Sequence, residues 1–263
     1  MEAAMSASGR NRNNHPLPWL NLMATEPFYL LHFLTFFSYF AARSAASPDL
    51  SPELSHLLFR REIQAVLTFS VLVAIKIVKE ETWDGFIADT LFYAKFFLFG
   101  AASIIDYHLA LCYLAAFVVI FILTQQPPYD GLGDSSHLTP LQLESLLTEG
   151  SKSRFWLVEF RALCSSTCIR TSRIFPDLSI TYANKNLSFG IVDLGHFPNA
   201  AEKFGISLSV TGQLPTYILF DNASEVARLP DIIVDAPAPT ITKNILIQHF
   251  ELDRRLVEYI SRR

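Results

Sequence analysis

The chain has 263 residues, of which 51% are hydrophobic and only 17% are charged, and 22 of them are Phe. This composition is more apolar than that of an ordinary soluble domain, so we expect much of the chain to lie in lipid. A formal net charge of -4, with no long run of Lys or Arg, argues against nucleic-acid binding.

A polar tail over residues 1–26 precedes four apolar stretches. They cover about residues 27–42, 63–78, 86–105 and 107–124. A bilayer core needs about 20 apolar residues, and the fourth stretch fits that length best. The third contains Asp89 and Lys95, which are costly in hydrocarbon unless paired, so it either spans the bilayer or lies in the interface. We predict three or four transmembrane or interfacial helices over residues 27–124.

The basic residues near the ends of these helices favour neither orientation in the membrane clearly. With four spans, the side of the amino-terminal tail holds Arg10, Arg12 and Lys79, and the opposite side holds Arg43, Arg60 and Arg61. These numbers nearly balance under the positive-inside rule. Asn186 and Asn222 fit the N-glycosylation pattern, which is either meaningful in a lumenal domain or a chance match. We expect a cytosolic carboxy-terminal domain, with a lumenal one as the alternative.

Residues 125–138, rich in Pro, Gly, Asp and Ser, read as a linker before a domain over residues 139–263. Thr139, Pro140 and Gln142 form a capping pattern that predicts a helix over residues 140–148. The patterns that follow predict strands at 155–160, 187–193, 217–220 and 225–229, and helices at 168–184, 199–204 and 243–260. This order predicts an α/β fold with a mixed sheet and helices on both faces.

Two motifs in this domain carry chemistry. A buried strand ending at Phe160 is followed by Leu-Cys-Ser-Ser-Thr-Cys, in which Cys164 and Cys168 form C-x-x-x-C. Downstream, Leu214 and Pro215 open an apolar strand. An X-Pro bond adopts the cis form at small cost, and a proline that opens a core strand usually marks a fixed tight turn.

An ordered series of short motifs resembles the thioredoxin-related transmembrane proteins over nearly the whole chain. The matching segments are residues 26–31, 127–129, 156–160, 177–179, 189–193, 213–216 and 247–250. The resemblance implies a thioredoxin-like fold, a central mixed sheet flanked by helices, placed after a helical transmembrane region. It also implies a multi-pass protein of the endoplasmic reticulum membrane with a role in cellular redox balance.

Aligned on the strand at 158–160, the family pattern gives roles to residues of the first motif. Cys164 stands where thioredoxins carry Trp, Ser165 at the nucleophilic cysteine and Cys168 at the resolving cysteine, while Glu159 matches the buried acid that accepts its proton. A serine forms no thiolate, so conventional disulfide exchange should be weak or absent. Our candidate catalytic residues are therefore Cys168, Cys164 and Glu159, and the candidate substrate-groove residues are Ser165, Leu214 and Pro215.

Two features of this site stay open. A helix amino-terminus near Cys168 could lower its pKa, and a disulfide with Cys164 needs Cα atoms within about 7 Å. The alternative is that both cysteines are simply packed side chains. Glu159 is either a general base or a carboxylate that reaches solvent or an internal water. Cys112 lies in the fourth stretch and is expected to pack there.

The sequence thus favours a membrane-anchored thioredoxin-like protein that senses or modulates cellular thiol redox state. The alternative is a non-catalytic interaction module that scaffolds a membrane partner. We expect protein clients bound in the proline groove over residues 211–216, contact with membrane lipid and, as a further option, a second copy of the chain. No cofactor or metal is expected, because His196 and Asp193 lack a third ligand at metal spacing.

Overall fold

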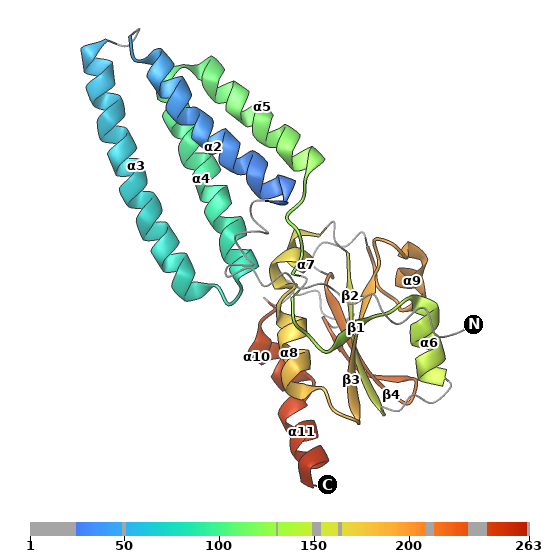
Figure 1. The fold of residues 1–263 in the computed structure, drawn as a ribbon. Helices are drawn as coiled ribbons and strands as arrows, with labels where there is room; N and C mark the ends of the chain where they lie inside the picture. Colours follow the sequence, from blue (N-terminus) through green and yellow to red (C-terminus); the bar gives the residue numbers. More distant parts are fainter. Residues whose placement is uncertain are drawn as a thin grey trace. The chain divides into compact units, whose positions relative to one another are not determined.

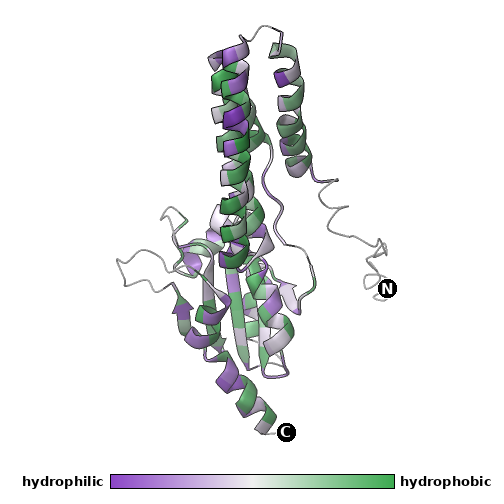
Figure 2. Ribbon diagram, turned by 90° about the vertical axis from the view of Figure 1, so that its left-hand side faces the viewer, coloured by the Kyte–Doolittle hydropathy of each residue, from purple (hydrophilic) through white to green (hydrophobic). Residues whose placement is uncertain are grey.

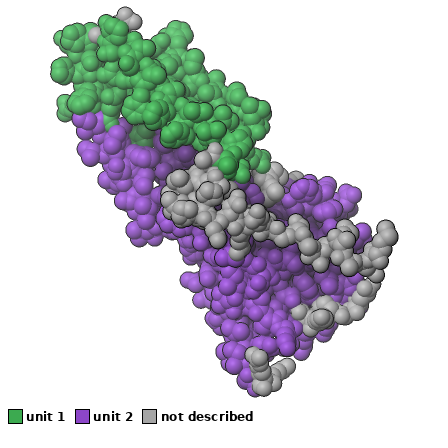
Figure 3. Space-filling model, viewed as in Figure 1, with its two compact units in different colours: residues 1–62, 97–125 green, residues 63–96, 126–263 purple. Residues whose placement is uncertain are grey.

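The computed structural model describes residues 25–48, 51–129, 131–148, 154–162, 165–208, 213–230 and 241–261. The described residues form helices and a five-stranded sheet (Figure 1). They fall into two compact units (Figure 3). The first comprises Met1–Glu62 with Phe97–Gln125, and the second comprises Ile63–Phe96 with Gln126–Arg263.

The first unit is helical and apolar. Helix α2 (Pro27–Ala46) packs on α5 (Tyr107–Leu123) through a small core that includes Tyr113 and Phe117. The ring of His32 stacks on that of Phe117 with 6.4 Å between centroids. Large apolar side chains elsewhere on these helices are exposed, and Figure 2 shows many hydrophobic residues in the helical part of the chain. Such a surface is what lipid-facing helices present.

The lengths of the helices change which of them is the best candidate for a membrane span. Helix α4 (Trp83–Ile105) has 23 residues and a mean hydropathy of 1.4, and among the described helices it alone is long and apolar enough to cross a bilayer. Helix α5 is more apolar but has only 17 residues. Helix α3 (Pro52–Lys79) is longer but carries several charges. The fourth apolar stretch, favoured from the sequence, is thus a weaker candidate than the third.

The second unit contains the sheet, whose strand order is β1-β3-β2-β4-β5. The strands are β1 (Ser135–His137), β2 (Phe155–Arg161), β3 (Leu187–Asp193), β4 (Thr216–Asp221) and β5 (Ser224–Leu229). The first three are mutually parallel, and β4 and β5 join in antiparallel fashion. The predicted mixed sheet is therefore confirmed.

Side chains alternate between the two faces of β2, and each face is covered by helices (Figure 1). Val158 and Phe160 pack with α6 (Pro140–Thr148) and α9 (Pro198–Lys203). Leu157 packs with α8 (Ile174–Tyr182), α10 (Lys243–His249) and α11 (Leu252–Ser261) on the other face. Glu159, two residues after Leu157, points to this second face, and that alternation is what buries it.

Three local features differ from the prediction. Strand β1 lies in the segment assigned to a linker, because Ser135 to His137 has no apolar run and gains its structure by pairing with β3. The helix expected over 168–184 is two helices, α7 (Ser166–Thr171) and α8. Its break is stabilised by Ser172, whose hydroxyl donates to the Ile169 carbonyl at 2.7 Å.

The carboxy-terminal helix expected over 243–260 is also divided. Glu251, between α10 and α11, has φ of 50°, a left-handed conformation that no continuous α-helix contains. By contrast, the capping box that begins α6 is confirmed. The Thr139 amide donates to Gln142 Oε1 at 2.9 Å, and the Gln142 amide donates to Thr139 Oγ1 at 3.2 Å.

The turn between β4 and β5 gives a first testable prediction. Its central residues, Asn222 and Ala223, have φ of 44° and 71°, and Ala lacks the tolerance of Gly or Asn for this region. We expect Ala223→Gly to stabilise the protein by about 0.5–1 kcal/mol, seen as a higher thermal unfolding midpoint. Asn222→Gly is the matched control and should have a smaller effect. A lower midpoint for Ala223→Gly would contradict this account of the turn.

Candidate functional site

The candidate site lies where β2 leads into α7. Ser165 is the N-cap residue of α7, half-buried, and its amide donates to the Ala162 carbonyl at 2.9 Å. Cys168 is the third residue of the helix. The Cys168 thiol therefore lies beneath the helix, against the sheet, while Ser165 stays at the helix end.

Cys168 is a free thiol with only 1% of its surface exposed. Burial raises the pKa of this thiol to about 11, although hydrogen bonds with the Ala162 backbone and the Ser165 side chain act in the opposite direction. The nearby Glu159 raises the pKa further and Arg161 lowers it. Of the two alternatives that the sequence left open, the raised pKa fits the packed thiol, because desolvation is the largest cause of the shift. At neutral pH the thiol is protonated.

Glu159 has no exposed surface, so the alternative in which its carboxylate reaches bulk solvent is wrong. Burial raises its pKa to about 7, while the Arg161 charge and a hydrogen bond from Tyr217 act against this shift. The Tyr217 hydroxyl donates to Glu159 Oε1 at 3.3 Å, and among the described residues Oε2 has no hydrogen-bond partner. A group with this pKa can hold or accept a proton at physiological pH.

Two further residues of the site, Arg161 and Tyr217, were not predicted from the sequence. Arg161 is 6% exposed, and its Nε and Nη1 atoms have no hydrogen-bond partner within the described ranges. It lies two residues after Glu159, hence on the same face of β2. Tyr217 pairs with Glu159 in the β2–β4 register, and burial raises its pKa well above the ordinary value. The alternation of side chains along β2 could have predicted that Arg161 shares a face with Glu159. Tyr217 could not be placed beside Glu159 without the pairing register of β2 and β4.

The predicted groove residues lie at the same end of the sheet. The Leu214–Pro215 peptide is cis, and the next residue, Thr216, pairs with Phe160 at the end of β2 from which the chain continues to α7. Leu214 is half-buried and Pro215 is buried. Cys164 and residues 211–212 lie outside the described residues, so their roles stay predictions. The structure thus brings together Glu159, Ser165 and Cys168.

His196 does not belong to this site. Its Nδ1 atom lies 2.9 Å from Asp193 Oδ2 in an exposed turn after β3. Within the described part of the chain, no three His, Cys, Asp or Glu residues gather as a metal site would require. Among the described residues, what the candidate site can do chemically therefore depends on one buried thiol, a neighbouring acid and a serine.

No protein-family model matches the chain. It is 28% identical to thioredoxin-related transmembrane protein 2 of Xenopus tropicalis over 250 residues, which cover 91% of this chain and 86% of the relative. It is 26% identical to the homologue of that protein in Drosophila melanogaster over 229 residues, covering 81% and 83%. A solved reduced thioredoxin preprotein of Schistosoma mansoni is 23% identical, covers 46% of this chain and 99% of its own length, and gives a TM-score of 0.35.

Proposed function

Because the chain belongs to the thioredoxin-related transmembrane protein family, we propose that this membrane thioredoxin-like protein senses or modulates cellular thiol redox state through a degenerate active site. The observation that carries the proposal is the pairing of Ser165 at the helix end with a buried Cys168 beside Glu159. Serine provides no attacking thiolate, and the remaining thiol is protonated and covered. Rapid dithiol turnover is therefore not its chemistry.

The exchange that this site supports is slow and begins at one thiol, that of Cys168. When α7 opens away from the sheet, Glu159 can accept the Cys168 proton, and the thiolate attacks one sulfur of a client or glutathione disulfide. The other sulfur leaves as a thiolate, which takes up a proton. Because Ser165 cannot attack the resulting mixed disulfide, only Cys164 or an external thiol can release it. Long-lived mixed disulfides are the signature of such a site.

The membrane setting belongs to the same proposal. We assign residues 27–124 to the membrane region of a multi-pass endoplasmic reticulum protein and residues 139–263 to a thioredoxin-like domain on the cytosolic side. Ser165, Leu214 and Pro215 would contact an extended client, and a second copy of the chain is a further partner to be tested. A glycosylation reporter at the carboxy-terminus, with inspection of Asn186 and Asn222 for glycans, determines the side.

A specific observation also favours the second candidate, a non-catalytic interaction module. A thiol that is 1% exposed, with its pKa raised to about 11, is the state of a packed side chain. In that case the thioredoxin-like domain would hold a membrane partner, and Cys168 would contribute only to the core.

One experiment separates the two candidates. The full-length protein in native membranes is treated with glutathione disulfide, its remaining thiols are alkylated, and peptides are assigned by mass spectrometry. We expect glutathione to accumulate on Cys168 over hours, and Cys168→Ser to abolish that adduct. Cys112→Ser serves as the control that leaves it unchanged. Absence of any adduct on Cys168 would leave only the binding role, and insulin reduction at thioredoxin-like rates would contradict the degenerate site.

A further inference from the structure

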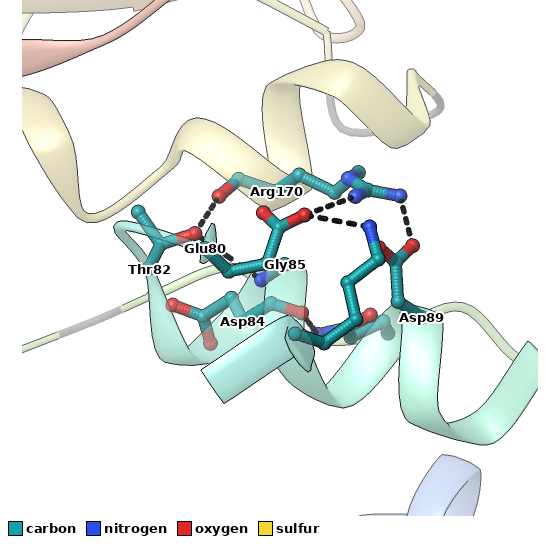
Figure 4. Close-up of polar contacts among 8 residues, drawn as sticks. Glu80, Thr82, Asp84, Gly85, Asp89 and Arg170 are labelled. Atoms are coloured by element: carbon teal, nitrogen blue, oxygen red, sulfur yellow. Dashed lines mark hydrogen bonds and ion pairs between the residues drawn. The ribbon is translucent and has the colours of Figure 1, made fainter. Parts of the chain in front are cut away.

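A ring of charged side chains joins α7 to the corner between α3 and α4, all within the second unit (Figure 4). Arg170 Nη1 lies 2.7 Å from Asp89 Oδ1, and its Nη2 lies 3.6 Å from Glu80 Oε1. Lys76 Nζ lies 2.5 Å from Asp89 Oδ2 and 3.0 Å from Glu80 Oε1. Cations and carboxylates therefore alternate around a closed ring that contains one residue of α7.

The backbone of the same residue is also held. Thr82 Oγ1 donates to the Arg170 carbonyl at 2.7 Å and accepts a hydrogen bond from the Gly85 amide at 3.2 Å. Gly85 is buried, and a Cβ there would lie 3.0 Å from Thr82 Oγ1 and 3.1 Å from Glu80 Oε2. The corner is thus closely fitted around Arg170, which it binds through both side chain and main chain.

The ring is more than an exposed ion pair of small effect. The exposed fractions of the Asp89, Lys76 and Glu80 side chains are 14%, 21% and 22%, and each carboxylate contacts both cations. Removing one cation leaves two partly buried carboxylates beside a single positive charge, which is costly. The ring also supplies the partners that Asp89 needs in α4, the helix long and apolar enough to span a membrane.

Arg170 lies on the same short helix as Cys168, so its contacts affect how well that thiol is covered. Helix α7 has six residues, too few to be stable without tertiary contacts, and the contacts at Arg170 add to the burial of Cys168 and Ile169 in holding it. Cys168 is two residues away and is covered by the packing of this helix on the sheet. Whatever releases Arg170 should therefore allow α7 to open and uncover the thiol.

We propose that Arg170 is a latch that fastens the thiol-bearing helix α7 to the amino-terminal end of α4 and thereby keeps Cys168 covered. Arg170 is a positioning residue, which acts on the thiol through the helix without touching it. Since α4 is the candidate membrane span, the thiol is fastened to the anchor itself. A disturbance of the α3–α4 corner would then change how readily Cys168 reacts.

The test measures the rate at which N-ethylmaleimide alkylates Cys168 in the full-length protein in detergent, with Cys112→Ser and Cys164→Ser so that labelling reports one thiol. Arg170→Gln and Asp89→Asn should each raise the rate about tenfold or more, because alkylation follows the opening equilibrium. Cys168 should be alkylated no faster in the double variant than in the faster single variant, since both changes break the same Arg170–Asp89 ion pair. Arg170→Lys should restore much of the protection.

The matched control is Arg228→Gln. Arg228 likewise pairs with a carboxylate, that of Glu225 in its own strand, and joins a second segment through the Phe204 carbonyl, and within the described ranges none of its hydrogen bonds or ion pairs involves α7. The proposal would be overturned if Cys168 were alkylated no faster in Arg170→Gln than in the protein that keeps Arg170, or no faster than in Arg228→Gln. If Arg170→Gln fails to fold, Thr82→Val decides by the same comparison with Arg228→Gln. Alkylation reports exposure and not exchange, so the latch can be established even where the redox proposal fails.

Discussion

Glu159→Gln will make the protein more stable at pH 8 by roughly 3 kcal/mol and leave its stability near pH 4 almost unchanged. In the folded protein burial raises the pKa of Glu159 to about 7, against an ordinary value of 4.5. The folded state therefore binds this proton more tightly than the unfolded state does. Its favourable contribution is complete below about pH 4.5 and is lost as the pH rises through about 7. Glutamine keeps the shape and never ionises.

The measurement is the thermal unfolding midpoint of the full-length protein in detergent between pH 4 and 8. The wild-type curve should fall relative to the Glu159→Gln curve across the window from about 4.5 to 7 and run parallel to it above that. Glu144→Gln, which makes the same substitution at a partly exposed carboxylate paired with Lys203, is the matched control. Parallel wild-type and Glu159→Gln curves throughout would show that folding leaves the pKa of Glu159 near its ordinary value of 4.5.

Much of the fold could be predicted because its signals are local. Helix α6 and strand β3 have the bounds that the sequence predicts, since a capping box starts the first and an apolar run defines the second. Strand β1 could not be predicted from Ser135 to His137, because its structure depends on the edge of β3. The break before α8 depends likewise on a tertiary contact, in which the Ser172 hydroxyl accepts a hydrogen bond from the Tyr129 amide at 3.0 Å.

The candidate site divides in the same way. The positions of Glu159, Ser165 and Cys168 follow from a motif, and the structure places them together. Arg170 could not be identified, because its partner Asp89 lies 81 positions earlier in a segment assigned to lipid. The direction of the Cys168 pKa shift stayed open for a different reason. The sequence shows that a helix begins nearby, but the amount of burial that opposes its field is known only from the packed structure.

Ser165→Cys should convert the site into one that exchanges disulfides, raising insulin reduction by about tenfold or more over the unaltered protein. Ser165 is half-buried at the N-cap of α7, and its side chain hydrogen bonds with Cys168. A sulfur at this position would lie close to the Cys168 sulfur. A partly exposed thiol at a helix amino-terminus forms its thiolate more readily than a buried one, so it can attack the insulin disulfide. Cys168 then attacks the mixed disulfide, releasing reduced insulin and leaving a bond between the two cysteines, which dithiothreitol reduces.

Ser166→Cys is the matched control, because it adds the same exposed thiol one residue further along the helix. Its activity should stay near that of the unaltered protein, since a displaced sulfur can form a mixed disulfide but is poorly placed to form the internal disulfide that completes turnover. The additional change Cys168→Ser should remove the gain shown by Ser165→Cys, because the second step then lacks the thiol at position 168. Equal activities for the Ser165→Cys and Ser166→Cys variants would mean that the two positions of the motif are not within exchange distance. The lost nucleophile would then not be what limits this site.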